Sequence, residues 1–131
     1  MPYAKQGSEG RAINSGGALI GPILDIRGAL ARLDGDDDLY VDLLDFYLED
    51  SARLLDQLNA AVAASDANEI KMAAHALKGL VAGCGGVRAM EAAKRVEHAA
   101  MANDLSAIGP LVEALTSELE LLRAEVIGYL A

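Results

Sequence analysis

Hydrophobic residues recur along this chain at three- and four-residue steps, the spacing of one face of an α-helix. The longest such stripe runs from Tyr40 to Val62, with aspartate and glutamate on the other side. A shorter stripe over 23–33 precedes it, and a further stripe over 111–126 lies near the C-terminus. Each stripe predicts an amphipathic helix that buries one side.

Polar and glycine-rich breaks separate the stripes. Residues 34–36, with the sequence Asp-Gly-Asp, end the short first helix. Asp66 followed by Glu69 resembles a capping box with an acidic N-cap, so a third helix is predicted over about 67–82. The glycine-rich stretch 83–86 stops it, because glycine adopts the backbone conformations of helix ends.

The remaining breaks complete an all-α architecture. A fourth helix is predicted over about 87–102, and Pro110 lies near the start of the last one. Four substantial helices with short connections predict an antiparallel up-down four-helix bundle with a short additional N-terminal helix, which begins near Pro22. Residues 1–21 have no period and are assigned to a disordered leader, a linker or an expression remnant; residues 22–131 form the bundle.

Composition agrees with one helical domain and excludes several classes of function. The chain has 131 residues, of which 53 % are hydrophobic but only 4 % aromatic, which favours helices packed through small side chains. Its net charge of −9 disfavours nucleic-acid binding. The lone Cys84 excludes an internal disulfide and a multi-cysteine zinc site. Neither an apolar run of ~20 residues nor a secretory signal is found, so no membrane contact and a cytoplasmic location are expected.

The helix predicted over 67–82 carries a histidine on its polar side. The residues within about 60° of Leu77 on a helical wheel, which define its buried side, are Ile70, Ala73, Ala74, Leu80, Val81 and Cys84. His75 lies at about 160° and is predicted to be exposed. The residues that share its outer face are Lys71, Lys78, Gly79 and Ala82.

This face has the features of a phosphoryl acceptor. Gly79 and Ala82 keep the surface low, and Lys71 and Lys78 make it locally positive in an acidic chain. Imidazole has an unperturbed pKa of about 6.5 and is a good nucleophile near neutral pH. Because no nucleotide cradle is evident, His75 could receive a phosphoryl group activated on another protein but not take one from ATP. A helix histidine beside a lysine is also an ordinary surface feature, and the wheel alone leaves both interpretations open.

The segment Ala74-His75-Ala76-Leu77-Lys78-Gly79 resembles the A-H-x-L-K-G signature of histidine-containing phosphotransfer (HPt) domains. The resemblance extends from Ile23 to Leu130. The other positions that keep the family's spacing are residues 33–40, Asp66 with Ile70, Gly85, and Val96 with Glu97. Gly86 and Ala89 depart from the family, which commonly has larger apolar residues there, so lighter packing between the third and fourth helices is expected.

The resemblance implies a role for each residue of the face. His75 would attack the aspartyl phosphate of a receiver domain through Nε2 and pass the group to another receiver aspartate. Lys78 would stabilise the phosphate, and Gly79 would permit docking. Glu97 would orient the imidazole through its other nitrogen, directly or through water. The chain would be a phosphocarrier without kinase activity of its own.

The resemblance also implies the partners. These are response-regulator receiver domains, a hybrid sensor histidine kinase, or both. No cofactor or metal site is expected on this chain, because in this family the Mg²⁺ of the transfer reaction belongs to the receiver. A relay domain needs only one copy, so a monomer is expected.

Several alternatives stay open from the sequence. The chain could be a helical interaction module or scaffold that binds receivers without relaying phosphate. A histidine-kinase dimerisation element is disfavoured because Ala76, and not an acidic residue, follows His75. A metal enzyme built on His75 and His98 lacks the Glu-x-x-His pairs of such bundles. His98 is predicted to be a surface residue and Cys84 a small buried hydrophobe.

Overall fold

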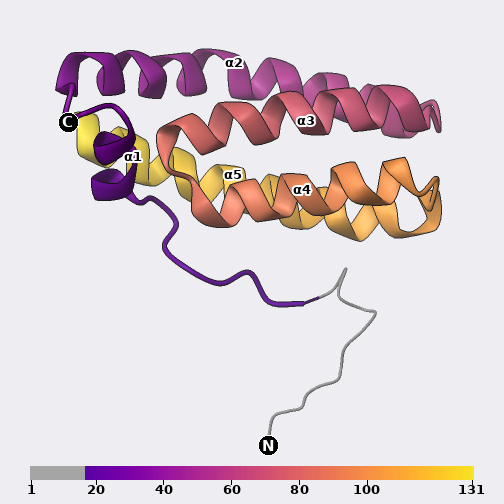
Figure 1. The fold of residues 1–131 in the computed structure, drawn as a ribbon. Coiled ribbons are helices and arrows are strands. Elements are labelled where there is room, and N and C mark those ends of the chain that lie inside the picture. The colour runs from indigo at the N-terminus through magenta and orange to yellow at the C-terminus, as the bar shows by residue number, and fades with distance from the viewer. Residues whose placement is uncertain (1–16) are drawn as a thin grey trace, which may run out of the picture.

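The computed structural model describes residues 17–131, in which all regular structure is helical (Figure 1). The elements are α1 (Ile26–Arg32), α2 (Asp37–Ala63), α3 (Ala67–Cys84), α4 (Val87–Met101), the 3₁₀ turn η1 (Leu105–Ala107) and α5 (Ile108–Leu130). Consecutive long helices run antiparallel and pack on one another, and α1 covers one end of the bundle. The predicted up-down four-helix bundle with a short N-terminal helix is confirmed. In this part of the chain, no helix has both the length and the apolar character needed to cross a membrane.

Aspartate side chains determine where three of the helices begin. Each N-cap carboxylate accepts a hydrogen bond from the backbone N–H three residues later, in the pairs Asp25–Gly28, Asp36–Leu39 and Asp66–Glu69. The predicted start of the third helix is therefore confirmed. The predicted start of the first helix near Pro22 is wrong, because the cap lies at Asp25 and the helix begins at Ile26.

The turn between α3 and α4 depends on Gly85. The helix continues through Gly83 to Cys84, two residues beyond the predicted end, and Gly85 then adopts a left-handed conformation with φ of 90°. The Asp25 N–H donates a 2.8 Å hydrogen bond to the Gly85 carbonyl. A side chain at position 85 would collide with the Asp25 backbone. Gly85 thus ends α3 and connects it to the start of α1.

Aliphatic side chains from alanine to leucine, together with two tyrosines, fill the core. Tyr40 and Tyr47 are fully buried, and their hydroxyl groups donate to the carbonyls of Cys84 at 2.7 Å and Leu119 at 2.6 Å. The buried side predicted for α3 is confirmed except at Leu80, which is half-buried. Cys84 is buried as predicted, and burial raises the pKa of its thiol to about 12.

Gly86, at the start of α4, lies close to a leucine of α5. A Cβ atom at Gly86 would lie 2.6 Å from Cδ2 of Leu122 in α5 and 3.3 Å from the Val81 carbonyl oxygen. Leu122 therefore fills the space that a larger residue at position 86 would need. This contact is with α5, so the lighter packing predicted between α3 and α4 stays a prediction, and Ala89 is buried.

The segment before α1 lies against α4. The Arg95 guanidinium donates to the carbonyls of Gly17 and Ala18, and a Cβ atom at Gly21 would lie 3.2 Å from the Val87 side chain. The predicted boundary between leader and bundle, after residue 21, thus falls inside a segment that contacts the bundle. The rest of the predicted leader, residues 1–16, lies outside the described residues.

Candidate functional site

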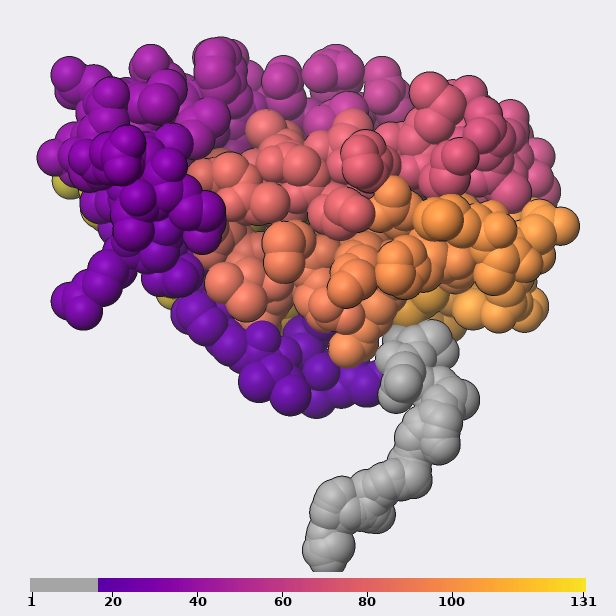
Figure 2. Space-filling model, in the orientation of Figure 1, coloured from indigo at the N-terminus to yellow at the C-terminus, as the bar shows by residue number. Residues whose placement is uncertain are grey.

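His75 projects from the middle of α3 with a side chain that is 68 % exposed. Its neighbours Ala74 and Leu77 are fully buried, so the helix holds the imidazole outward while its other side is fixed in the core. The prediction that His75 is exposed is confirmed. In Figure 2 the middle of α3 lies uncovered at the surface between α2 and α4. A partner can therefore reach the ring.

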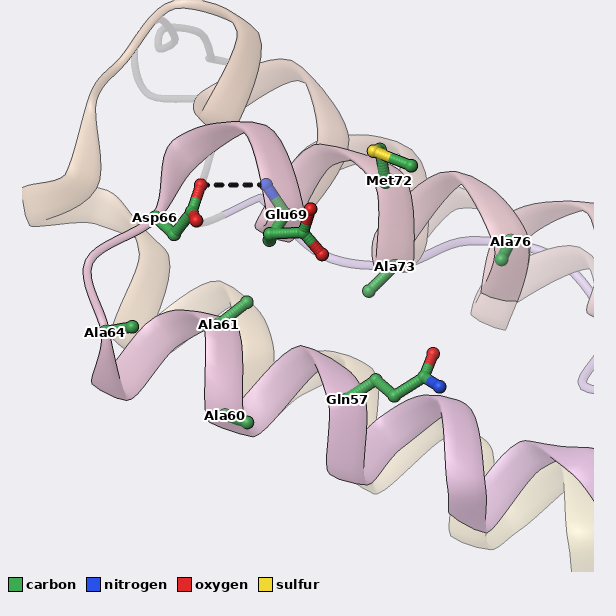
Figure 3. Close-up of a pocket in the computed structure, with 9 residues that line it drawn as sticks. All are labelled: Gln57, Ala60, Ala61, Ala64, Asp66, Glu69, Met72, Ala73 and Ala76. Atoms are coloured by element: carbon green, nitrogen blue, oxygen red, sulfur yellow. Dashed lines mark hydrogen bonds between the residues drawn. The ribbon is translucent and has the colours of Figure 1, made fainter.

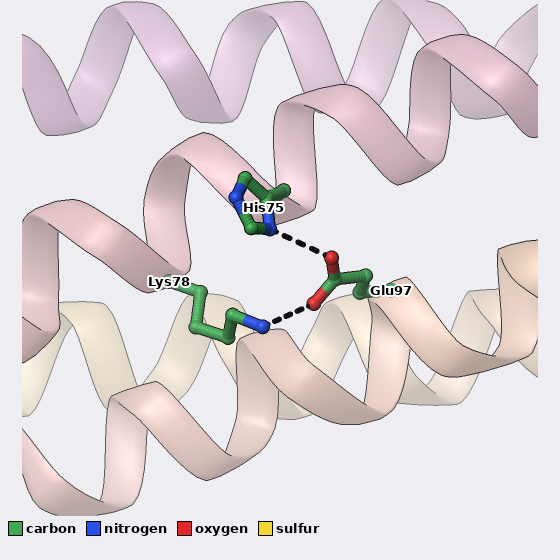
Figure 4. Close-up of polar contacts among 3 residues, drawn as sticks. All are labelled: His75, Lys78 and Glu97. Carbon is green, nitrogen blue, oxygen red and sulfur yellow. Dashed lines mark hydrogen bonds and ion pairs between the residues drawn. The ribbon is translucent and has the colours of Figure 1, made fainter.

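Glu97 of α4 connects the histidine and the lysine of α3 (Figure 4). Its Oε2 lies 2.7 Å from His75 Nδ1, and its Oε1 accepts a 2.6 Å hydrogen bond from Lys78 Nζ. The Glu97 side chain is only 10 % exposed. Both carboxylate oxygens are therefore engaged, and the contact with the imidazole is direct.

The environment of Glu97 keeps it ionised. Burial by itself raises the pKa of this carboxyl, but the hydrogen bonds and positive charges of Lys78 and His75 outweigh that effect, and the net pKa is lowered. An ionised carboxylate can only accept hydrogen bonds, so Nδ1 of the imidazole carries a proton. In the neutral ring Nε2 then holds the free lone pair and faces away from Glu97.

The lysines contribute less free positive charge than the sequence suggested. Lys78 is 29 % exposed and paired with Glu97, so the charge of its ammonium is compensated. Lys71 is half-buried one turn before His75 and has no ion-pair partner among the described residues. Glu97 of α4 therefore compensates one of the two lysines that were predicted to make this face locally positive.

The surface beside His75 is low at Gly79, as predicted. No atom lies within 4 Å of the position that a Cβ atom would take at Gly79. Ala82 is half-buried one turn further, and its carbonyl accepts a 3.2 Å hydrogen bond from the Arg32 guanidinium. Sequence reasoning missed this α1 cation, which is 50 residues away in the chain.

A hollow of about 600 Å³ opens on the other side of His75, between the end of α2 and the start of α3 (Figure 3). The residues that line it are Gln57, Ala60, Ala61, Ala64, Asp66, Glu69, Met72, Ala73 and Ala76. Alanines make up most of this lining, so the surface next to His75 is also low on this side. Met72 exposes 55 % of its surface here.

The other candidate groups lie apart from this site. His98 is exposed on α4 and has no hydrogen bond or ion pair to His75, Lys78 or Glu97. Among residues 17–131, no group of three or more histidine, cysteine, aspartate or glutamate side chains is arranged to hold a metal ion.

Comparison with solved structures yields two similar chains. Histidine-containing phosphotransfer protein B (HptB) from Pseudomonas aeruginosa PAO1 is 29 % identical, with a TM-score of 0.76 over 84 % of this chain and 96 % of that one. The HPT domain of a sensor hybrid histidine kinase from Shewanella is 19 % identical, with a TM-score of 0.73 over 82 % of this chain and 93 % of that one. The second likeness concerns the fold alone. No curated protein matches the chain.

The family assignment rests on the sequence match. A model of the Hpt domain family matches residues 42–125, which include most of α2, all of α3 and α4, and most of α5. His75, Lys78 and Glu97 all lie inside this range. The chain belongs to the Hpt domain family, whose members act in phosphotransfer relays.

Proposed function

We propose that this chain is a phosphocarrier that accepts a phosphoryl group on Nε2 of His75 from a receiver-domain aspartyl phosphate and passes it to another receiver aspartate. In the first step the Nε2–P bond forms while the P–O bond of the acyl phosphate breaks, and the aspartate leaves as a carboxylate. The second step is the reverse reaction with a different receiver. The observation that carries this proposal is the exposed imidazole whose Nδ1 is bound to Glu97 at 2.7 Å.

Glu97 supports the attack as a positioning residue. With Nδ1 protonated, Nε2 can attack without losing a proton first, and the product is a phosphoimidazolium that keeps its Nδ1–H. The positive charge that develops on the ring lies next to the Glu97 carboxylate, as in other sites where a carboxylate holds an imidazole. The carboxylate thus selects the tautomer and stabilises the charge of the product.

Lys78 supplies the charge that meets the phosphate. Its ammonium has three donors, one of which is directed at Glu97 in this structure. The other donors can bind phosphoryl oxygens once the group is on His75. Lys71 and Arg32 extend the positive charge along this side of α3, where the acidic phosphorylation pocket of a receiver, with its Mg²⁺, would dock.

A carrier role fits this chain better than a kinase role. The glycine-rich turn over 83–86 follows a helix, and two of its glycines are closely packed: Gly85 against the Asp25 backbone and Gly86 against Leu122. Such a turn is structural and not a phosphate cradle. The phosphoryl group would therefore come from a receiver or a hybrid sensor histidine kinase, and a single copy of the chain is enough for the reaction.

The test is to find where the phosphate goes. Receiver domains phosphorylated with a small-molecule phosphodonor are mixed with the chain, and the label on the chain is followed. A phosphoramidate is labile in acid and stable in base, and mass spectrometry should place it on the peptide that contains His75. Binding of receivers without any label would instead support the interaction module. A label on His98 or on a carboxylate would contradict the proposed site.

Replacement of Lys78 by alanine should slow transfer about tenfold, which corresponds to ~1.4 kcal/mol of transition-state stabilisation. The lifetime of the phosphohistidine should also shorten, because the phosphate loses a cation. The buried Glu97 carboxylate loses one of its two partners and keeps the contact with His75, so the melting temperature should fall modestly, and transfer is measured well below it. Rapid-quench measurement of transfer and decay checks this, with Lys94→Ala on the exposed side of α4 as the matched control. Equal rates in both variants would rule out a role for Lys78.

Replacement of Gly79 by leucine should weaken receiver docking about tenfold or more, because a side chain would occupy the low surface that a partner approaches. Open space surrounds this position, so the fold should tolerate the change. Gly128→Leu is the matched control, since Gly128 is also an exposed helical glycine with open space around it. Receiver affinity measured by calorimetry should fall only for the Gly79 variant. Thermal unfolding of Gly79→Leu well below the wild type would contradict the exposed-face geometry.

Replacement of Glu97 by alanine should change the tautomer of His75 and slow transfer several-fold. In the wild type, ¹⁵N chemical shifts of the neutral ring should report a proton on Nδ1. Without the carboxylate, the ring should shift toward the Nε2–H form that predominates in free imidazole side chains. Because a merely structural role would not move this signal, an unchanged tautomer in Glu97→Ala would show that Glu97 does not orient the ring.

A further inference from the structure

A groove of about 300 Å³ lies between α2 and α5, on the side of the bundle opposite the seam between α3 and α4. Among the neighbouring long helices of the bundle, α2 and α5 pack together least closely. The residues that line the groove are Tyr47, Leu48, Ser51, Ala52, Leu55, Thr116, Leu119, Glu120 and Arg123. None of them belongs to the His75 site.

The length and apolar character of the groove fit a helix. Its apolar lining includes Leu48, Leu55 and Leu119. Ile127 continues the same edge of α5 one turn beyond Arg123, and 49 % of its surface is exposed. The lining of α5 from Thr116 to Arg123 is about 10 Å long, or two helical turns, and Ile127 adds one turn beyond the groove. An amphipathic helix places apolar residues at this spacing when it binds in a groove.

Both edges of the groove carry carboxylates. Along α2, Asp45 and Glu49 stand seven and three residues before Ala52, and Asp56 stands four residues after it, so all three share its edge. Along α5, Glu113 stands seven residues before Glu120 on the same edge, as the helical repeat requires. These five side chains are all exposed.

Arg123 is the one cation among the described residues that line the groove, and its guanidinium donates to the Leu48 carbonyl at 3.4 Å. This guanidinium reaches from α5 to α2, so an occupant of the groove would meet apolar side chains and Arg123 between two negative edges. Lysine or arginine side chains on both sides of an apolar face complement such edges, whereas an acidic occupant would be repelled.

We propose that this groove binds an amphipathic helix with basic flanks from a partner protein. Because the groove and His75 lie on opposite sides of the bundle, a bound helix would leave the phosphorylation site open to receivers. The groove would then fix the domain to a partner during the relay instead of taking part in the transfer. This inference goes beyond the proposed phosphocarrier role and does not depend on it.

The test uses a synthetic 14-residue helical peptide with leucines at one-turn spacing and lysines on both flanks. A peptide of the same pattern with glutamate in place of lysine is the control. The lysine peptide should bind the full chain with a micromolar Kd, and the glutamate peptide at least tenfold more weakly. Amide chemical-shift changes should map to α2 and α5 and leave the residues around His75 unchanged.

Two variants separate the groove from the overall negative charge. Ala52→Trp fills the groove without changing its charge and should weaken binding of the lysine peptide at least tenfold. Ala52 is exposed, so the core is not disturbed. Glu120→Lys should weaken binding of the lysine peptide about fivefold at low salt. Glu125→Lys makes the same charge change on the opposite edge of α5 and should have little effect. Transfer from receivers to His75 should be unchanged in all three variants.

Three outcomes would overturn the proposal. Glu120→Lys and Glu125→Lys could weaken peptide binding equally, or the Ala52→Trp variant could bind the peptide as tightly as the wild type. The third outcome is that the amide chemical-shift changes map to α3 and α4. Analytical sedimentation of the free chain tests whether a second copy of the chain occupies the groove. A dimer that Ala52→Trp dissociates would assign the groove to self-association and also overturn the proposal. Loss of transfer in the wild type would contradict the phosphocarrier role and leave the peptide result standing.

Discussion

Replacement of His75 by glutamine should abolish phosphorylation of the chain, lowering the label it takes from a phosphorylated receiver by a factor of at least ~10³. Glutamine has a similar size and can still hydrogen-bond to Glu97, but its amide nitrogen has no lone pair available to attack phosphorus. The side chain is 68 % exposed, so the fold should not change. Circular dichroism and the melting temperature should therefore match those of the wild type.

His98→Gln is the matched control for this loss, because the chain has two histidines and both are exposed. It should be phosphorylated at the wild-type rate. Receiver affinity should also persist in His75→Gln, since docking depends on the surrounding surface more than on the ring itself. Retention of label in His75→Gln, or its loss in His98→Gln, would contradict the site. Loss of receiver binding in a folded His75→Gln would show that the ring acts in docking.

The helices were predictable because their signals are local. The stripe from Tyr40 to Val62 contains its own period, and Asp66 with Glu69 marks a helix start within four residues. The exposure of His75 follows from its angle to Leu77 on one helix. Helix ends were less predictable where residues distant in the sequence contact them. α3 continues to Cys84 because the left-handed residue is Gly85, whose position depends on contact with Asp25.

The electrostatics of the site could not be predicted from α3 alone. The two oxygens of Glu97 contact His75 and Lys78, but the register between α3 and α4 determines whether they reach both. The family resemblance suggested an orienting role for Glu97, whereas periodicity gave no sign that it also neutralises Lys78. Gly86 shows the same limit, because its close contact with Leu122 involves helices that are distant in sequence.

Replacement of Arg88 by alanine should destabilise the domain by about 3–5 kcal/mol, because it would leave a buried carboxylate without its counter-charge. Arg88 Nη2 donates to Glu118 Oε2 at 2.7 Å, and the Glu118 side chain is only 8 % exposed. The other carboxylate oxygen, Glu118 Oε1, is buried and has no hydrogen-bond partner among the described residues. The melting temperature should fall by on the order of 10 °C. Urea unfolding followed by circular dichroism measures the loss.

The double replacement Arg88→Met with Glu118→Leu separates the charge pair from packing. Removing both charges also removes the cost of burying them, so the double variant should be close to the wild type in stability and well above Arg88→Ala. Both residues lie between α4 and α5, away from His75, so phosphorylation below the melting temperature should be normal in each variant. A double variant as unstable as Arg88→Ala would show that the arginine side chain stabilises the bundle by packing and not by its charge.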